Sequence, residues 1–519
     1  MAHDESSNPA EGCVLNFLGE FSVHRLYDMV FTNQKEKQKL YYKAISLEVN
    51  AQQGMLFLSK EASVDLLTYF NCFSIIKWKQ YTTLKELIIA GEIAGKAEIK
   101  IFTAGKGGKT IDIFKTEGVF VKSFKIKDLS GELLGLEIKA TTDCCIKEIS
   151  YNGEFESWRN LKIRAVICTY KREKYVNATI KKLSDFSHEF PWFSSLVVDN
   201  GSTLPTCNTE IVKIIHNPNY GGSGGFTRGL MEELRSNSSD YVLLMDDDID
   251  LEPAVLNHMY GLLCGIKEEY KESFLSGAML RMQTPVIQHE NTAYWGKIRL
   301  HSLGSGWDLS KQDTLVKNEQ IPDRENHYGA WWFCCIPLTR VPQIGYPLPV
   351  FIKGDDIEYG IRNNRKIIHM NGIGIWHEAF ENKQSLWVDY YAYRNFFIMN
   401  QYAKGCNRWT LLAMICGRLT VHFIKRHFKE TKIFNIALRD AMQGFDRLTA
   451  VPAEKQLEQV RALQGDGSYI AAVFSILWKA FKCMFLYEKI KKDYLAFRQE
   501  KLMDAVFWRE YLKNGKYTL

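Results

Sequence analysis

The pattern of apolar and polar positions divides the chain into three parts, the first of which reads as strand. Between residues 13 and 160, short apolar or alternating runs recur, separated by turn signals such as the GKGG at Gly105–Gly108. A period of two is typical of half-buried strands, and runs at this spacing predict a sandwich or barrel. We therefore predict strands over Leu84–Ala90, Ala97–Phe102, Val119–Phe124, Leu134–Ala140 and Ile146–Tyr151.

The pattern changes at Leu161, where the largely apolar run LKIRAVICTY begins. Continuous apolar runs are typical of buried parallel strands. Strand and helix patterns then alternate, with strands expected over 161–170, 193–198, 212–216 and 241–245 and helices over 174–183 and 226–234. This alternation predicts a parallel α/β sheet, which binds its ligands at the carboxyl ends of the strands.

From about residue 405 the apolar positions follow a helical period among many Lys and Arg residues. We predict helices over Trp409–Phe428, Ala437–Phe445, Glu454–Leu463, Ser468–Tyr487 and Asp493–Leu512. The three patterns predict a β-sandwich over residues 1–160, an α/β domain over 161–404 and a helical region over 405–519. Because charged residues interrupt Leu411–Ile424 and Ile470–Phe481, we expect neither apolar stretch to span a bilayer.

Composition narrows the class of protein. Hydrophobic residues make up 46% and charged residues 24%, which is typical of a globular protein and excludes disordered or fibrous chains. A net charge of +6 is too small to predict nucleic-acid binding. The 12 cysteines contain no CxxC pair, and the N-terminus, MAHDESSNPAEG, is too polar for a signal peptide. We therefore expect a cytoplasmic protein with reduced thiols.

The strongest candidate for chemistry is Asp246-Asp247-Asp248, directly after the apolar run YVLLM. Adjacent carboxylates repel one another unless a cation binds, and oxygen ligands suit Mg²⁺ or Mn²⁺. Alternate residues of a strand point the same way, so Asp246 and Asp248 can share an ion. An EF-hand is excluded, because Leu251 replaces its glycine and Asn257 its closing glutamate. A solvated acidic turn is the remaining alternative.

A glycine-rich segment, NPNYGGSGG at Asn217–Gly225, is the second candidate. Its glycines let backbone amides approach an anion at a helix start, although a flexible loop has the same composition. The segment lacks the Gly-Lys-Ser/Thr of a P-loop. Its GxSxG match at Ser223 is separated by NPNY from the strand ending at His216, which argues against a hydrolase nucleophile.

Three further motifs are each open to more than one interpretation. Asp355-Asp356 in FIKGDDIEYG predicts a general base, a metal site or a helix cap. His377 in WHEAF lacks the second histidine of a zincin, so it is either structural or completes the aspartate metal site. Trp331-Trp332 fits either core packing or a platform for sugar rings.

The motifs together resemble a known family. ICTYKR, VVDNGS, NPNYGGSGGF, MDDDI, GAWWFCCIP, PLPVFIKGDDIEYG and WHEAF…YYAYRN occur in this order over roughly residues 60–400. In this order they resemble the inverting family 2 glycosyltransferases and, within them, the polymerising galactofuranosyltransferases of mycobacterial cell-wall galactan. The resemblance implies an α/β GT-A core, Rossmann-like and nucleotide-sugar-binding, with an N-terminal β-sandwich and a C-terminal helical region.

The resemblance also implies roles for single residues. It implies a metal site formed by Asp246, Asp248 and His377, and a catalytic base at Asp356. It implies nucleotide-sugar contacts by Thr169, Arg172, Asn200, Asn219, Asp246 and Asp247. An acceptor site would include Trp331, Trp332 and Asp355. The family's acceptor-holding glutamate has no aligned acid after Ala278–Gln283, and Glu290 is the nearest.

The implied reaction is metal-dependent, inverting transfer of galactofuranose from UDP-galactofuranose to a glycan or lipid-linked glycan, in bacterial cell-surface polysaccharide synthesis. The ion would be Mn²⁺ or Mg²⁺. Two alternatives stay open: another donor, rhamnosyl or galactopyranosyl, or a non-catalytic glycan-binding subunit, against which the acidic and WH motifs argue. The basic C-terminal helices fit peripheral contact with the inner face of the cell membrane, a homo-oligomer interface, or packing on the catalytic domain.

Overall fold

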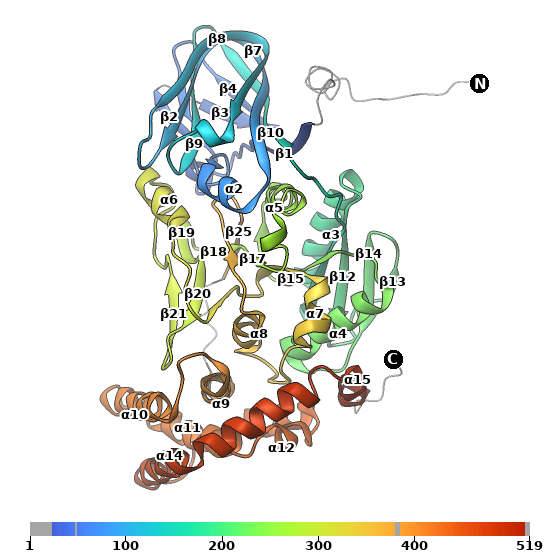
Figure 1. Cartoon of the computed structure of the whole chain (residues 1–519), viewed down its shortest axis with the longest axis vertical. Helices are drawn as coiled ribbons and strands as arrows, with labels where there is room; N and C mark the ends of the chain where they lie inside the picture. Colours follow the sequence, from blue (N-terminus) through green and yellow to red (C-terminus); the bar gives the residue numbers. More distant parts are fainter. Residues whose placement is uncertain (1–22, 47–48, 379–384, 514–519) are drawn as a thin grey trace, which may run out of the picture.

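The computed structural model describes residues 23–46, 49–378 and 385–513. These residues form three parts along the long axis of the molecule: N-terminal strands, a central α/β part and C-terminal helices (Figure 1). The polar segment MAHDESSNPAEG and Cys13 lie outside the described residues. The domain boundaries at residues 160 and 404 stay predictions.

The N-terminal part is mostly strand, as predicted. Its ladder runs β2-β5-β9-β7-β10-β4-β3, with β8 paired to β7, β1 to β10 and β6 to β9. The expected sandwich is thus one ladder of ten strands rather than two separate ladders. The bounds are β1 Val23–Asp28, β2 Lys43–Ser46, β3 Val49–Gln52, β4 Met55–Leu58, β5 Ser63–Asp65, β6 Phe73–Ser74, α2 Ile75–Tyr81, β7 Leu84–Ala104, β8 Thr110–Lys125, β9 Leu133–Ala140 and β10 Cys144–Phe155.

Strand β7 joins the two halves of this sheet, since it lies between β9 and β10 in the ladder. It spans both segments that the sequence pattern predicted as separate strands, and its register shifts between Ile93 and Lys96. Its first half pairs with β10 and its second half with β9. Gly95 lies at the shift with a positive φ of 93°, and a Cβ there would stand 2.4 Å from the Asp143 carbonyl oxygen. The strand therefore bends where only glycine fits.

The central part contains an eight-stranded sheet in the order β13-β14-β12-β11-β15-β23-β17-β24. The four strands predicted from the sequence, β14, β12, β11 and β15, are adjacent and parallel, whereas β23 pairs antiparallel with β15. The strands are β11 Ile163–Thr169, β12 Phe193–Asp199, β13 Cys207–Asn208, β14 Val212–His216, β15 Tyr241–Asp246, β17 Phe274–Ser276, β23 Phe333–Pro337 and β24 Ile367–Ile368. The helices are α3 Glu173–Glu189, α4 Gly221–Ser236, α5 Ala254–Cys264, α7 Val341–Ile344 and α8 Asp355–Asn363.

Two smaller sheets complete this part. The first, in the order β16-β25-β18-β19, runs β25 antiparallel to β16 and parallel to β18. Its strands are β16 Asp250–Leu251, β18 Ala278–Arg281, β19 Thr284–Glu290 and β25 Gly374–His377. The second contains β20 Thr292–Trp295, β21 Leu300–Leu303 and β22 His327–Tyr328, and α6 Gln312–Glu319 lies between β21 and β22 in the chain.

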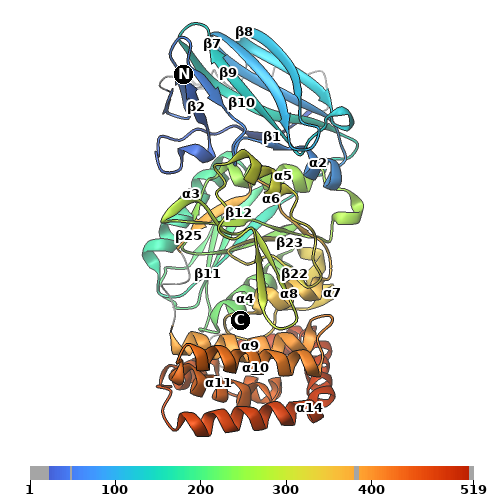
Figure 2. The same cartoon turned by 90° about the vertical axis from the view of Figure 1, so that its left-hand side faces the viewer.

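The C-terminal part is helical, as predicted, and lies at the opposite end from the N-terminal sheet (Figure 2). Helix α14 is continuous where two helices were predicted, because Tyr487, Ile490 and Tyr494 extend its buried face. By length and composition α14 can cross a membrane, although the structure contains no membrane. The helices are α9 Leu386–Tyr402, α10 Arg408–Ile424, α11 Phe428–Ala441, α12 Phe445–Thr449, α13 Ala453–Arg461, α14 Tyr469–Glu500 and α15 Ala505–Lys513.

Candidate active site

Three neighbouring strands end at the same edge of the central sheet. Thr169 ends β11, Asp199 ends β12 and Asp246 ends β15; Thr169 pairs with Asp199, and Cys168 pairs with Asp246. Asp199 is buried, and its carboxylate accepts the backbone N–H groups of Gly201, Thr203 and Leu204 at 2.7–2.8 Å. Asp199 therefore shapes the loop after β12, while Thr169 and Asp246 face the site.

The three consecutive aspartates point in different directions. Asp247 accepts hydrogen bonds from the Thr169 hydroxyl at 2.6 Å and from Arg172 at 3.1 Å. Asp248 accepts a hydrogen bond from Arg172 at 2.7 Å. His377 Nε2 lies 3.0 Å from the other Asp248 oxygen and 3.9 Å from an Asp246 oxygen. Asp246 and Asp248 thus meet at one point with His377, whereas Asp247 turns toward β11.

The donor set of Asp246, Asp248 and His377 fits a divalent cation. One ligand atom from each residue lies within 4.8 Å of the others. Although the Asp246 side chain is 37% exposed, its removal from bulk water, with the charges of Asp248 and Asp247, raises its pKa to about 7. Burial opposes the charged form of His377, but its hydrogen bond to Asp248 and the Asp246 charge raise its pKa. A bound cation would relieve this repulsion between carboxylates.

A cavity of about 300 Å³ opens beside these aspartates. All six residues predicted to contact the nucleotide sugar line it: Thr169, Arg172, Asn200, Asn219, Asp246 and Asp247. Asp248 and His377 also line this cavity. The fold therefore brings the predicted donor residues and the predicted metal ligands to one place.

The glycine-rich segment is the first turn of α4 rather than a loop. Gly221 has a φ of 67° and is held by the Asn200 amide, which donates to its carbonyl at 2.9 Å, and by Asn219, which accepts its N–H at 3.2 Å. A Cβ at Gly225 would stand 2.2 Å from Cys168 Sγ, so glycine lets α4 approach β11. The Ser223 N–H likewise donates to the Phe351 carbonyl at 3.2 Å, so what Gly221 and Gly222 bring to the cavity that they line is the positive end of the α4 dipole. Ser223 is buried and donates to the Leu348 carbonyl, which excludes it as a nucleophile.

The C-terminal helices close the same cavity, which the sequence analysis missed. Trp387 of α9 and Leu457 and Arg461 of α13 line it. The Arg461 guanidinium carbon lies 5.2 Å from the centre of the Trp387 ring, within cation–π range. No local signal could have found these residues, because an arginine at a helix end and a tryptophan in a first turn are ordinary.

Asp355 and Asp356 begin α8, but the N-cap residue is Gly354, which makes no side-chain cap. Burial and the neighbouring Asp356 raise the pKa of Asp355 to about 8. Burial raises the pKa of Asp356 only to about 6, because the Ile357 N–H at 2.8 Å and the charge of Lys353 oppose the shift. A Cβ at Gly222 would stand 3.6 Å from an Asp355 oxygen, so the pair adjoins the donor cavity.

Glu290 is a further acid at this site. It ends β19, accepts a hydrogen bond from the Ser302 hydroxyl and is buried. Burial raises its pKa to about 7, and the charge of Asp356 adds to the shift. Glu290, the acid nearest in the sequence to the expected glutamate position, therefore lies close enough to Asp356 for their charges to interact.

Trp331 and Trp332 lie between the helices of the site and are both almost buried. The Trp331 ring packs against Phe226 of α4 and Tyr359 of α8, with centroids 5.1 and 5.8 Å away. Trp332 donates its indole N–H to the Gly277 carbonyl at 2.9 Å. Trp331 therefore packs between the two site helices and Trp332 is bonded to the segment before β18, and the acceptor role of the pair stays a prediction.

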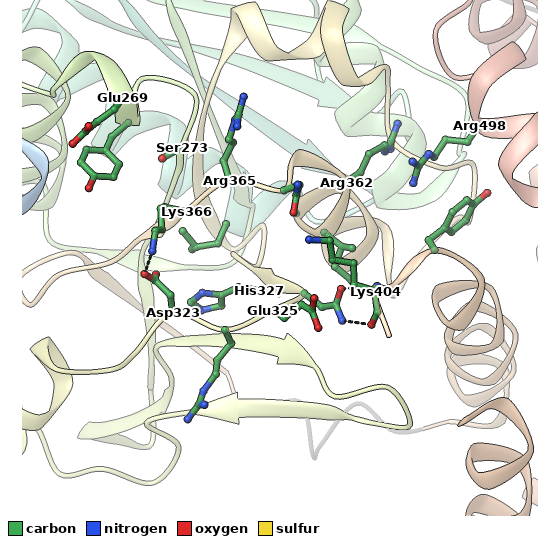
Figure 3. Close-up of a pocket in the computed structure, with 18 residues that line it drawn as sticks. Glu269, Ser273, Asp323, Glu325, His327, Arg362, Arg365, Lys366, Lys404 and Arg498 are labelled. Atoms are coloured by element: carbon green, nitrogen blue, oxygen red, sulfur yellow. Dashed lines mark hydrogen bonds and ion pairs between the residues drawn. The ribbon is translucent and has the colours of Figure 1, made fainter. Parts of the chain in front are cut away.

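A larger cavity, of about 830 Å³, lies toward the far end of α8 (Figure 3). It is lined by many charged groups, but several are paired, such as Lys366 with Asp323 and Arg362 with Glu358 at 2.7 Å. None of the predicted site residues lines it. We therefore place the donor site in the smaller cavity.

This chain is similar to known glycosyltransferases. The family model described as galactofuranosyltransferase 2 N-terminal matches residues 23–151, and that of glycosyl transferase family 2 matches residues 165–268. Galactofuranosyltransferase GlfT2 from Mycolicibacterium smegmatis is 25% identical over 452 residues, which cover 79% of this chain and 68% of that protein. GlfT2 from Mycobacterium tuberculosis is 23% identical over 457 residues, covering 79% and 69%.

Among solved structures, S. aureus TarS 1-349 in complex with UDP-GlcNAc matches with a TM-score of 0.35 and 15% identity, covering 63% of this chain and 92% of that one. At this score the match adds nothing to the assignment, which depends on the two family models and the GlfT2 relatives. The predicted GT-A-like fold, with its N-terminal strands and C-terminal helices, is confirmed. The chain is a glycosyltransferase, related to GlfT2, that carries a family 2 domain behind an N-terminal galactofuranosyltransferase 2 domain.

Proposed function

We propose that this enzyme transfers galactofuranose from UDP-galactofuranose to a hydroxyl of a glycan or lipid-linked glycan, with inversion, in bacterial cell-surface polysaccharide synthesis. The observation that carries the proposal is the donor cavity, where the six predicted nucleotide-sugar residues and the Asp246, Asp248 and His377 cluster meet. The GlfT2 relatives support the choice of donor.

The donor's diphosphate would lie between Arg172 and the start of α4. Arg172 supplies positive charge, and the positive end of the α4 dipole at Gly221–Gly222 favours an anion. Asp246, Asp248 and His377 would hold Mn²⁺ or Mg²⁺, which when bound neutralises charge on the UDP leaving group. Thr169, Asn200 and Asn219 would orient the nucleotide.

Asp356 is the proposed base. Its pKa of about 6 leaves it ionised at neutral pH, so it can accept the proton of the acceptor hydroxyl. That oxygen attacks the anomeric carbon as the bond to UDP breaks on the opposite side, which inverts the configuration. Asp355, with its pKa of about 8, stays protonated and would hydrogen-bond the acceptor. Trp331 and Trp332 would line the acceptor groove.

UDP release tests the proposal directly. The full chain is given UDP-galactofuranose or UDP-galactopyranose with a short galactofuranose-containing acceptor, with and without EDTA. Release from the furanose donor alone, abolished by EDTA, supports the proposal. Release only from another nucleotide sugar would replace the donor. Metal-independent glycan binding without any release would favour a glycan-binding subunit instead.

We further propose a cytoplasmic site of action. The cysteines of the described residues are unpaired, including the neighbouring pairs Cys144-Cys145 and Cys334-Cys335. Free thiols persist in a reducing compartment. Fractionation of cells that produce the protein, with protease protection of intact cells, tests this placement, and cleavage from outside would contradict it.

A further inference from the structure

The segment 350–354 leads directly into α8, and its backbone is strained. We call it the α8 loop. Phe351 has a φ of 72° and Lys353 a φ of 64°, in a region that residues with a Cβ rarely adopt. The Ile352 N–H donates to the Val350 carbonyl at 3.0 Å, which closes a tight turn around Phe351. Strain of this kind persists only where neighbouring groups hold it, and it is concentrated at active sites.

A buried amide of α9 holds the α8 loop. The side-chain nitrogen of Asn395 donates to the Ile352 and Lys353 carbonyls at 2.7 Å and lies 3.2 Å from the Val350 carbonyl. Arg394 donates from Nε to the Asn395 side-chain oxygen at 2.9 Å and from Nη2 to the Val350 carbonyl at 2.7 Å. Both side chains are buried. Because a guanidinium can only donate, its bond to the Asn395 oxygen fixes the direction in which the amide nitrogen points.

The α8 loop also contacts the donor cavity. Phe351 and Ile352 line that cavity. The Phe351 carbonyl accepts the Ser223 N–H at 3.2 Å, and a Cβ at Gly221 would stand 2.2 Å from the same oxygen. The start of α4 therefore packs directly on the loop. Since α8 follows the loop without a break, this one segment connects α9, the donor cavity and Asp356.

We propose that Asn395 is a positioning residue for the transfer step, because its amide holds the α8 loop in the strained form that places Asp356 beside the donor. The proposal rests on the proposed role of Asp356 as the base. Asn395 is not among the described residues that line the donor cavity, so it acts through the loop rather than on the donor. A base that shifts by about 1 Å can lose roughly 10²-fold in rate.

UDP release by the full chain, with saturating donor and acceptor, tests the proposal. In Asn395→Ala, kcat should fall about 10²-fold, whereas the UDP Kd measured by calorimetry with Mn²⁺ should change less than about threefold. Binding should persist because the proposed donor contacts lie on other elements. Asn395→Ser, whose hydroxyl can still donate to one carbonyl, should lose less kcat than Asn395→Ala.

Asn400→Ala is the matched control for lost stability. Asn400 lies on the same helix, is buried to the same extent and donates to the Lys297 carbonyl at 2.9 Å, outside the α8 loop. Its variant should lose melting temperature to a similar extent as Asn395→Ala and yet keep parental kcat. An equal loss of kcat in the two variants would overturn the proposal, since it would reduce the role of Asn395 to packing.

A double-variant cycle with Asp356→Asn separates positioning from general damage. If Asn395 acts through Asp356, Asn395→Ala/Asp356→Asn should be about as slow as Asp356→Asn alone, whereas independent losses multiply. Parental kcat in Asn395→Ala, or multiplied losses in the double variant, would overturn the proposal. If Asn395→Ala is insoluble, Asn395→Ser takes its place in the same cycle. Parental turnover in Asp356→Asn would refute the base and this proposal with it, so the two failures are distinguishable.

Discussion

Asp355→Asn and Asp356→Asn should differ sharply in turnover, although the two residues are adjacent at the start of α8. Asparagine matches a protonated aspartate in shape and keeps its hydrogen-bonding capacity, but it cannot take up a proton. In Asp356→Asn the amide oxygen can still accept the Ile357 N–H, which in the parent is 2.8 Å from Asp356 Oδ1. The local backbone should therefore persist in both variants, and the difference between them isolates the chemistry.

The magnitudes follow from the protonation states. Burial raises the pKa of both carboxyls, but that of Asp355 more, so Asp356 is the member of the pair that ionises first and Asp355 keeps its proton to higher pH. Loss of the base should lower kcat by about 10²–10⁴, or roughly 3–5 kcal/mol of barrier. Asp355→Asn replaces a group that is already neutral, so kcat should fall by less than about tenfold.

Steady-state UDP release between pH 5 and pH 9, with UDP binding by calorimetry, measures both effects. Only the ionised form of Asp356 accepts a proton, so kcat/KM of the parent should fall as pH drops through about 6. An aspartate at its ordinary pKa would keep activity to near pH 4. The Asp356→Asn enzyme should bind UDP normally, and its kcat/KM should no longer fall as the pH drops through about 6.

Two results would refute this reasoning. If Asp355→Asn loses as much turnover as Asp356→Asn, the assignment of the proton within the pair is wrong. If Asp356→Asn keeps parental turnover, or if its kcat/KM still falls as the pH drops through about 6, then Asp356 is not the base. In that case Glu290, whose pKa of about 7 also lies in this range, becomes the residue to change next.

Three further predictions concern metal, donor and stability. His377→Ala should weaken Mn²⁺ binding, measured by calorimetry without substrate, by about tenfold or more; unchanged affinity would remove His377 from the site. Arg461→Ala should raise the UDP Kd by about tenfold without a comparable loss of kcat, whereas the exposed Arg439→Ala should change neither. Burial alone would raise the pKa of the Glu232 carboxyl, but hydrogen bonds from Arg235, Lys213 and Arg228 outweigh it and lower that pKa from an ordinary 4.5 to about 2. The stabilisation that ionised Glu232 gives the fold is present above pH 4.5 and is lost as the pH falls toward 2. The melting temperatures of Glu232→Gln and the parent should therefore differ less at pH 3 than at pH 6.

The donor half of the site was predictable because its geometry is local. Asp246 and Asp248 follow an apolar strand, and the alternation of side chains along a strand separates them from Asp247. The predicted strand at 212–216 has the bounds that β14 has in the structure. Thr169 ends another strand of the same sheet and Asn200 and Asn219 follow two more, so parallel topology brings together residues whose roles the family resemblance implies.

Elements that depend on distant packing were not predictable. The placement of His377 depends on β25, a strand of four residues whose partners β16 and β18 lie more than 90 residues earlier. A segment so short has no periodicity to detect. Likewise the pattern divided β7 at Gly95, although the ladder continues through a register shift, because glycine signals a break whether or not the strand continues.

The helical region is better understood as part of the active site than as an appendage to it. Leu457 and Arg461 of α13 line the cavity beside the aspartates, and Arg498 of α14 lies 3.8 Å from Glu358 of α8, the helix that begins with Asp355 and Asp356.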